Sequence, residues 1–183
     1  FVNPPGWPAG VGASAFERCA RESPSIMSNS SDKSDSVSVA VRVRPLLPKD
    51  VAEGARECLR KLAGAPQLVL GADRSFTFDH VFEPDEPNGV VFDSCARDLV
   101  QGTLDGYNAT VFAYGQTGSG KTYTATGPPG GDMAGDEERG LLPRLLEEAF
   151  AELARRQKEE PSDEDAFYRC ACSHLEIHNE QIT

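Results

Sequence analysis

Residues 115–122, Gly-Gln-Thr-Gly-Ser-Gly-Lys-Thr, constrain the fold of this chain most strongly, because they match the G-x-x-x-x-G-K-[ST] pattern of a phosphate-binding loop. Glycines in such a loop let the backbone curl until its N–H groups point inward at an anion. Lys121 supplies a charge that can reach the β- and γ-phosphates, and the Thr122 hydroxyl is a hard oxygen suited to Mg²⁺. The pattern predicts a site for a nucleoside triphosphate.

The residues on either side of this loop support that interpretation. Residues 111–114, Val-Phe-Ala-Tyr, are β-branched and aromatic, which is typical of a buried parallel strand. A helix can begin at Lys121, and the Gly-Pro-Pro-Gly run at residues 127–130 would end it. Strand, glycine-rich loop and helix is the order that phosphate binding requires. The alternative, a glycine-rich turn that happens to contain one lysine, explains none of these neighbours.

A second group of candidate residues lies near the start of the patterned region. Residues 37–45 alternate and are β-branched, so they predict a strand that ends at Pro45. Arg42 and Arg44 fall on one face of that strand. They could be paired surface charges on an exposed face, or their planar guanidinium groups could line a nucleotide base beside the proline ring. The residues alone leave these alternatives open.

The remaining pattern alternates helices and strands, which predicts an α/β protein of roughly one domain. Residues 50–64 suit a short helix or an irregular link. Phe76, Phe78 and Phe82 are expected in the core. The other expected elements are strands at 67–70, 74–78 and 166–177, an amphipathic helix over 88–106, and a helix over 141–156 whose apolar face comprises Leu142, Leu145, Leu146, Ala149, Phe150 and Leu153.

Composition narrows the class of protein further. The chain has a net charge of −11, and no apolar run is long enough to span a membrane. Its five cysteines form no C-x-x-C pair, which favours reduced thiols that serve as small core residues in an intracellular protein. Residues 1–36 are rich in Gly, Pro, Ser and Asn, so we expect a disordered extension, with Met27 as a plausible natural start.

Several blocks that occur in one order give the sequence a specific resemblance to the kinesin motor domain. Val-Arg-Val-Arg-Pro at 41–45 and Phe-Thr-Phe-Asp at 76–79 look like the first-strand motif and the F-x-F-D-x-V-F segment of that family. Residues 106–124 are similar to its phosphate-loop signature almost letter for letter. The resemblance runs from about residue 37 to the end, and residues 48–54 and 71–73 lean toward the chromokinesin-type subfamily.

This resemblance implies a P-loop NTPase fold of kinesin type, in which helices flank a central, mostly parallel β-sheet. It also implies ATP and Mg²⁺ as ligands. Lys121 and Thr122 would act in catalysis, with Thr122 as the metal ligand. Arg42, Arg44, Pro45 and Tyr123 would enclose adenine, which favours the functional reading of the two arginines. The implied nucleotide-binding set is Arg42, Arg44, Pro45, Gly115, Gln116, Thr117, Gly118, Ser119, Gly120, Lys121, Thr122 and Tyr123.

The function that the resemblance implies is that of an ATP-dependent microtubule motor, with residues 37–183 as the N-terminal portion of its head. Its switch regions, its microtubule-contacting elements and a coiled-coil stalk for homodimerisation would lie beyond residue 183. A cytoplasmic, cytoskeletal location would follow, with no indication of nucleic-acid binding. An alternative is a kinesin-like regulator that binds nucleotide and microtubules without moving; intact Ser-Ser-Arg and Asp-Leu-Ala-Gly runs downstream would favour the motor. An unrelated phosphate-loop NTPase is disfavoured by the Tyr-Gly-Gln-Thr run at 114–117.

A polypeptide limited to these 183 residues should be unstable or aggregate. In kinesin-like sheets, later strands lie between the first strand and the phosphate-loop strand, and between the latter and the strand predicted at 166–177. Without those strands, each buried ladder group that lacks a partner costs roughly 1–3 kcal/mol. Circular dichroism during heating is the measurement, and a cooperative melt with a native-like near-ultraviolet spectrum would contradict the prediction.

Overall fold

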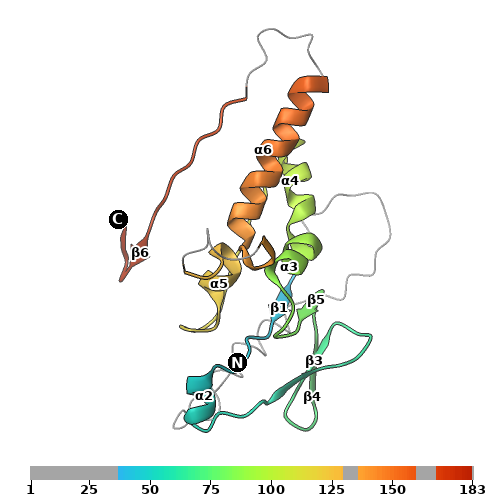
Figure 1. Ribbon diagram of the computed structural model, residues 1–183, viewed down its shortest axis with the longest axis vertical. Helices are drawn as coiled ribbons and strands as arrows, with labels where there is room; N and C mark the ends of the chain where they lie inside the picture. Colours follow the sequence, from blue (N-terminus) through green and yellow to red (C-terminus); the bar gives the residue numbers. More distant parts are fainter. Residues whose placement is uncertain (1–36, 130–135, 160–167, 183) are drawn as a thin grey trace.

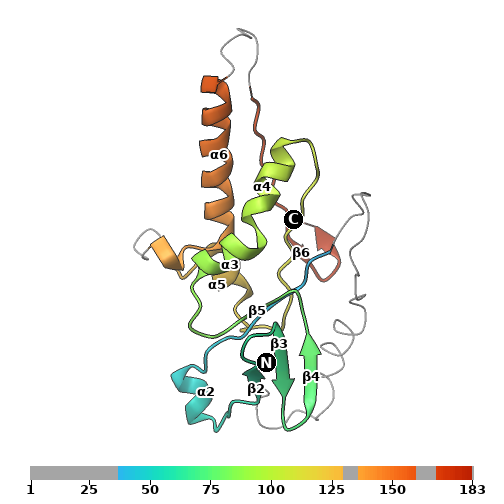
Figure 2. The same ribbon diagram turned by 90° about the vertical axis from the view of Figure 1, so that its right-hand side faces the viewer.

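The computed structural model describes residues 37–129, 136–159 and 168–182. A small strand-rich lobe lies at one end, and a group of helices extends away from it (Figure 1). Figure 2 shows the same arrangement after a quarter turn, with the longest helix again at the end opposite the strand-rich lobe. The disorder predicted for residues 1–36 lies outside the described residues.

The strands of the lobe form two separate sheets. β1 (Ala40–Arg42) pairs in parallel with β5 (His80–Phe82). β2 (Leu59–Lys61), β3 (Gln67–Leu70) and β4 (Arg74–Thr77) form an antiparallel sheet, so the strands predicted at 67–70 and 74–78 are confirmed. Residues 50–64, for which the sequence suited either a short helix or an irregular link, contain the end of a short helix, α2 (Pro48–Ala52), and strand β2.

The single helix predicted over 88–106 is two helices in the structure, α3 (Asn88–Cys95) and α4 (Arg97–Leu104). The break falls at Ala96, whose φ of −125° is not helical. No proline or glycine marks this position, so the sequence carried no signal for it. Ala96 is 1% exposed, and the bend accompanies its packing into the core.

The helices that follow the phosphate-binding loop are close to the prediction. α5 (Lys121–Thr126) ends where the glycine-proline run begins, and α6 (Leu141–Glu159) extends three residues past the predicted end. A short 3₁₀ turn, η2 (Asp136–Glu138), leads into α6. At Gly140 a Cβ atom would overlap the backbone of Thr126 and Gly127, so the start of α6 lies directly against the end of α5.

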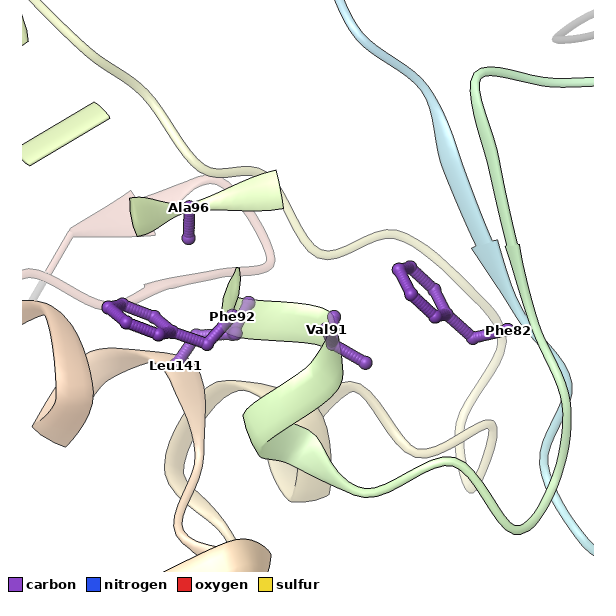
Figure 3. Packing of buried hydrophobic residues seen from close by; sticks show 5 residues of the cluster. All are labelled: Phe82, Val91, Phe92, Ala96 and Leu141. Carbon is purple, nitrogen blue, oxygen red and sulfur yellow. The ribbon is translucent and has the colours of Figure 1, made fainter. Parts of the chain in front are cut away.

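Two clusters of buried side chains hold these elements together. Figure 3 shows the first, in which Phe82 from β5 and Val91 from α3 share a core with the three residues Phe92, Ala96 and Leu141. The second cluster joins Leu68, Phe78 and Val81, with Phe76 packed against it. The prediction that the three phenylalanines belong to the core is therefore confirmed. Phe82 also connects the lobe to the helices, because β5 enters the first cluster.

Two predicted strands do not form among the described residues. Residues 111–114 have no strand assignment, and Phe112 and Tyr114 are 81% and 73% exposed. Of the strand predicted at 166–177, residues 168–176 have no strand assignment. Only Ile177 belongs to a strand, β6 (Ile177–His178), which forms a hairpin with β7 (Gln181–Ile182). A strand needs a neighbour for its N–H and C=O groups, and no described strand pairs with residues 111–114 or with residues 168–176.

Side-chain burial corrects two further expectations. Leu142, Leu146 and Phe150 of the predicted apolar face of α6 are each more than half exposed, because no sheet of the described residues covers them. Cys58, Cys170 and Cys172 are exposed rather than core residues, whereas Cys95 is half-buried. None of the helices among the described residues is both long and apolar enough to cross a bilayer.

Instead, α6 buries a carboxylate against α4. Glu152 accepts hydrogen bonds from Arg155 and from Arg156, which lies one turn after it. Arg156 also donates to the Leu104 carbonyl at 3.2 Å and pairs with Asp105 at 2.9 Å, which ties α6 to the end of α4. The hydrogen bonds from Arg155 and Arg156 lower the pKa of Glu152 to about 2.

This arrangement predicts an acid-sensitive contact. A carboxyl whose pKa is lower in the folded state stabilises the fold above its ordinary pKa of 4.5, and that contribution falls away as the pH drops toward about 2. Glu152→Gln in the complete protein should therefore lower the melting temperature at pH 7, and the difference from wild type should shrink between pH 4.5 and pH 2. Calorimetry over that range is the measurement; a gap that does not depend on pH would contradict this role of Glu152.

Candidate nucleotide-binding site

The phosphate-binding loop has a backbone that specifically needs glycine. Gly118 and Gly120 have φ values of +79° and +99°, in the region that L side chains rarely adopt. At Gly115 a Cβ atom would collide with the Ser119 hydroxyl, so a larger residue here would require the Ser119 side chain to move. The Ser119 N–H donates to the Gln116 carbonyl at 3.1 Å, which closes the turn. The loop is therefore a compact cradle that leads directly into α5.

Lys121 closes this cradle from the side of the helix. Its ammonium group donates to the carbonyl oxygens of Gly115 at 2.8 Å and Gln116 at 2.9 Å. The positive charge thus lies across the mouth of the loop. An entering phosphate would replace neutral carbonyl partners with charged oxygens, which form stronger hydrogen bonds with an ammonium group.

Thr122 is the residue expected to hold Mg²⁺. It is exposed in the first turn of α5, next to Lys121. The described residues contain no group of three or more His, Cys, Asp and Glu side chains that could hold a metal by itself. Mg²⁺ commonly combines few protein ligands with substrate phosphates and water, so one hydroxyl beside a phosphate cradle fits that ion.

Arg42 from β1 reaches the helix that follows the loop. Its guanidinium lies over the Tyr123 ring, 5.1 Å from the centroid, and donates to the Thr124 hydroxyl at 3.1 Å. A second nitrogen donates to the Glu86 carbonyl at 2.9 Å. Burial lowers the pKa of Arg42, and Tyr123 and Glu86 oppose that shift. The structure thus brings together a planar cation and an aromatic ring that lie far apart in the sequence.

Arg44 and Pro45 are placed differently. Arg44 forms an ion pair with Asp50 at 2.7 Å, and Pro45 is exposed. The Leu47 backbone N–H and the Arg44 guanidinium lower the pKa of Asp50. The structure therefore joins Arg42 to Tyr123 and gives Arg44 a partner of its own beside α2.

Asn88 is the site residue that the sequence analysis missed. It is fully buried at the first position of α3. Its side-chain nitrogen donates to the Tyr123 carbonyl at 3.1 Å and the Glu138 carbonyl at 2.7 Å, and its oxygen accepts from Arg42. A polar residue after Pro87 reads as an ordinary helix start, and nothing in its neighbours indicated burial.

Comparison with known proteins gives a family match and several similar sequences. The family described as the kinesin motor domain matches residues 42–183. The chromosome-associated kinesin KIF4A of Homo sapiens is 42% identical over 146 residues, which cover 80% of this chain and 11% of that protein. The kinesin-like protein KIF21B of Homo sapiens is 42% identical over 149 residues, 80% of this chain and 9% of that protein. The kinesin-like protein KIF27 of Mus musculus is 40% identical over 148 residues, 80% of this chain and 10% of that protein. The chain thus spans only 9% to 11% of the length of these relatives.

The backbone of the loop generates a paired prediction. Gly120→Ala in the complete protein should weaken nucleoside triphosphate binding about tenfold or more, because a side chain at φ +99° costs roughly 1–3 kcal/mol or forces the loop to change. Gly102→Ala in α4 is the matched control, since its Cβ would meet no atom within 4 Å. It should leave affinity unchanged and stabilise the helix by up to about 1 kcal/mol. Titration calorimetry and melting temperatures are the measurements, and equal effects of the two substitutions would contradict the prediction.

Proposed function

This chain belongs to the kinesin motor family, and on that premise we propose that the complete protein is an ATP-dependent microtubule motor. Residues 37–183 would be the N-terminal portion of its motor domain, after an extension formed by residues 1–36. The family match supports the motor part of the proposal, and the meeting of Arg42 and Tyr123 beside the phosphate-binding loop supports the nucleotide-binding part. General phosphate binding needs the loop alone, whereas a flat cation over an aromatic ring suits a nucleotide base.

ATP would bind with its phosphates in the loop and its base against Arg42 and Tyr123. The backbone N–H groups of residues 115–121 would hold phosphate oxygens, and Lys121 would exchange its two carbonyl partners for the β- and γ-phosphates. Thr122 would hold Mg²⁺, which neutralises charge on the phosphates. Arg44 and Pro45 complete the proposed base site, although Arg44 would have to share its charge with Asp50.

Hydrolysis depends on further groups that orient water and sense the γ-phosphate. We propose that the rest of the protein supplies them, together with the microtubule-contacting surface and a coiled-coil stalk that makes a homodimer. The same part of the protein would add the strands that pair with residues 111–114 and cover the exposed face of α6. The central, mostly parallel sheet with flanking helices is completed only in that way.

The partners and the location follow from the same proposal. The protein would bind tubulin in microtubules and act in the cytoskeleton of the cytoplasm. Several of its relatives are chromosome-associated kinesins, in line with the predicted lean toward the chromokinesin-type subfamily. Chromosomes are accordingly one cargo to test.

Lys121→Ala in the complete protein tests the enzymatic part of the proposal. Loss of the ammonium that lies across the loop should reduce microtubule-stimulated ATP hydrolysis about 100-fold or more. Lys158→Ala is the control, because it removes the same charge from a lysine that is exposed at the end of α6. Steady-state phosphate release is the measurement. ATP hydrolysis that survives Lys121→Ala would exclude this loop as the site of ATP hydrolysis. A wild-type protein that binds ATP but does not move microtubules in a gliding assay would favour the non-motile regulator.

A further inference from the structure

The fully buried Asn88 side chain has hydrogen-bonding partners in three separate parts of the chain. One is on β1, one in α5 and one at the end of η2, at sequence separations of 46, 35 and 50 residues. Both amide hydrogens and the amide oxygen are used. A buried polar group with all of its bonds satisfied holds its partners in one arrangement, because breaking any bond leaves an unpaired group.

Both members of the base-binding pair depend on this one amide. The oxygen of Asn88 accepts from the same Arg42 nitrogen that donates to Thr124, and the amide nitrogen donates to the backbone of Tyr123 itself. Arg42 is thereby held over the ring, and the turn of α5 that carries the ring is held relative to β1. The third bond, to the Glu138 carbonyl, attaches this group to the segment that leads into α6.

The phosphate-binding loop is held by other contacts. Its bonds run from Lys121 to Gly115 and Gln116 and from Ser119 to Gln116, and none of the bonds found for the Asn88 side chain reaches residues 115–120. A change at Asn88 should therefore disturb the base side of the site and spare the phosphate side. A residue that merely supported the fold would affect both sides alike.

We propose that Asn88 is a positioning residue for the nucleotide base, which sets the relative placement of Arg42 and Tyr123 and thereby contributes to the preference for a base-bearing triphosphate. This inference rests on the proposed function, since it presumes that ATP occupies the site. The chemistry favours an amide, because a carboxylate at this fully buried position would place an oxygen against the Tyr123 and Glu138 carbonyls.

The experiment compares two ligands on the complete protein, Mg·ATP and Mg·tripolyphosphate, which carry similar phosphates but differ in the base. Asn88→Asp should weaken ATP binding about tenfold or more and change tripolyphosphate binding less than about twofold. In steady-state hydrolysis the KM for ATP should rise while kcat changes little. Gln157→Glu is the matched control, because it makes the same amide-to-carboxylate change at an exposed position of α6. It should alter neither affinity.

Two further variants keep the proposal falsifiable. If Asn88→Asp does not fold, Asn88→Ser, which keeps one short hydroxyl donor, takes its place with the same expected selectivity. In a Tyr123→Leu background, Asn88→Ser should weaken ATP binding less than it does in the wild type, because one of the two groups that Asn88 positions is already gone. Equal weakening of both ligands, an undiminished effect in that background, or unchanged ATP affinity would each overturn the inference. Failure of the wild-type protein to bind ATP would instead overturn the proposed function and remove this inference with it.

Discussion

The candidate site depends on a contact between the first strand of the described structure and the helix that follows the phosphate-binding loop. Arg42 meets Thr124, 82 residues later, and lies over the Tyr123 ring. That contact places a planar cation over an aromatic ring on the helix directly after the loop. Its energy comes from the cation–π attraction and from hydrogen bonds that are partly withdrawn from water, where each is stronger than at the surface. In the proposed function, the loop would hold the phosphates and this contact would recognise the base.

Strand pairing is the constraint that limits the remainder of the fold. The one parallel pair among the described residues, β1 with β5, forms because both strands lie within the first half of the chain and share the clusters around Phe82 and Val81. Residues 111–114 have equally strong strand character but remain exposed. Apolar side chains favour a strand, but backbone hydrogen bonds with a neighbour decide whether it forms. The exposed apolar side of α6 has the same cause, because an amphipathic helix is buried only where something covers it.

The local elements were the most predictable part of this protein. The helix after the loop, the two strands around Gly71 and the core phenylalanines follow from residues near one another in the chain. The break at Ala96 and the burial of Glu152 on α6 could not be predicted, because both accompany contacts between residues distant in sequence: Ala96 shares a core with Leu141, and Arg156 beside Glu152 donates to the Leu104 carbonyl. In the site, the sequence indicated Arg42 and Tyr123 but not Asn88, whose role depends entirely on the three partners around it.

The sequence by itself determined the chemistry of the loop. Three glycines, a lysine and a threonine at fixed spacing impose a particular backbone path and place particular donors on it, whatever surrounds them. Only the tertiary structure decided which of two similar arginines lies over the tyrosine and which pairs with Asp50. Alternation along a strand puts both arginines on one face, but the position of α2 and α5 beside that face assigns each its partner, and those positions are set by long-range packing.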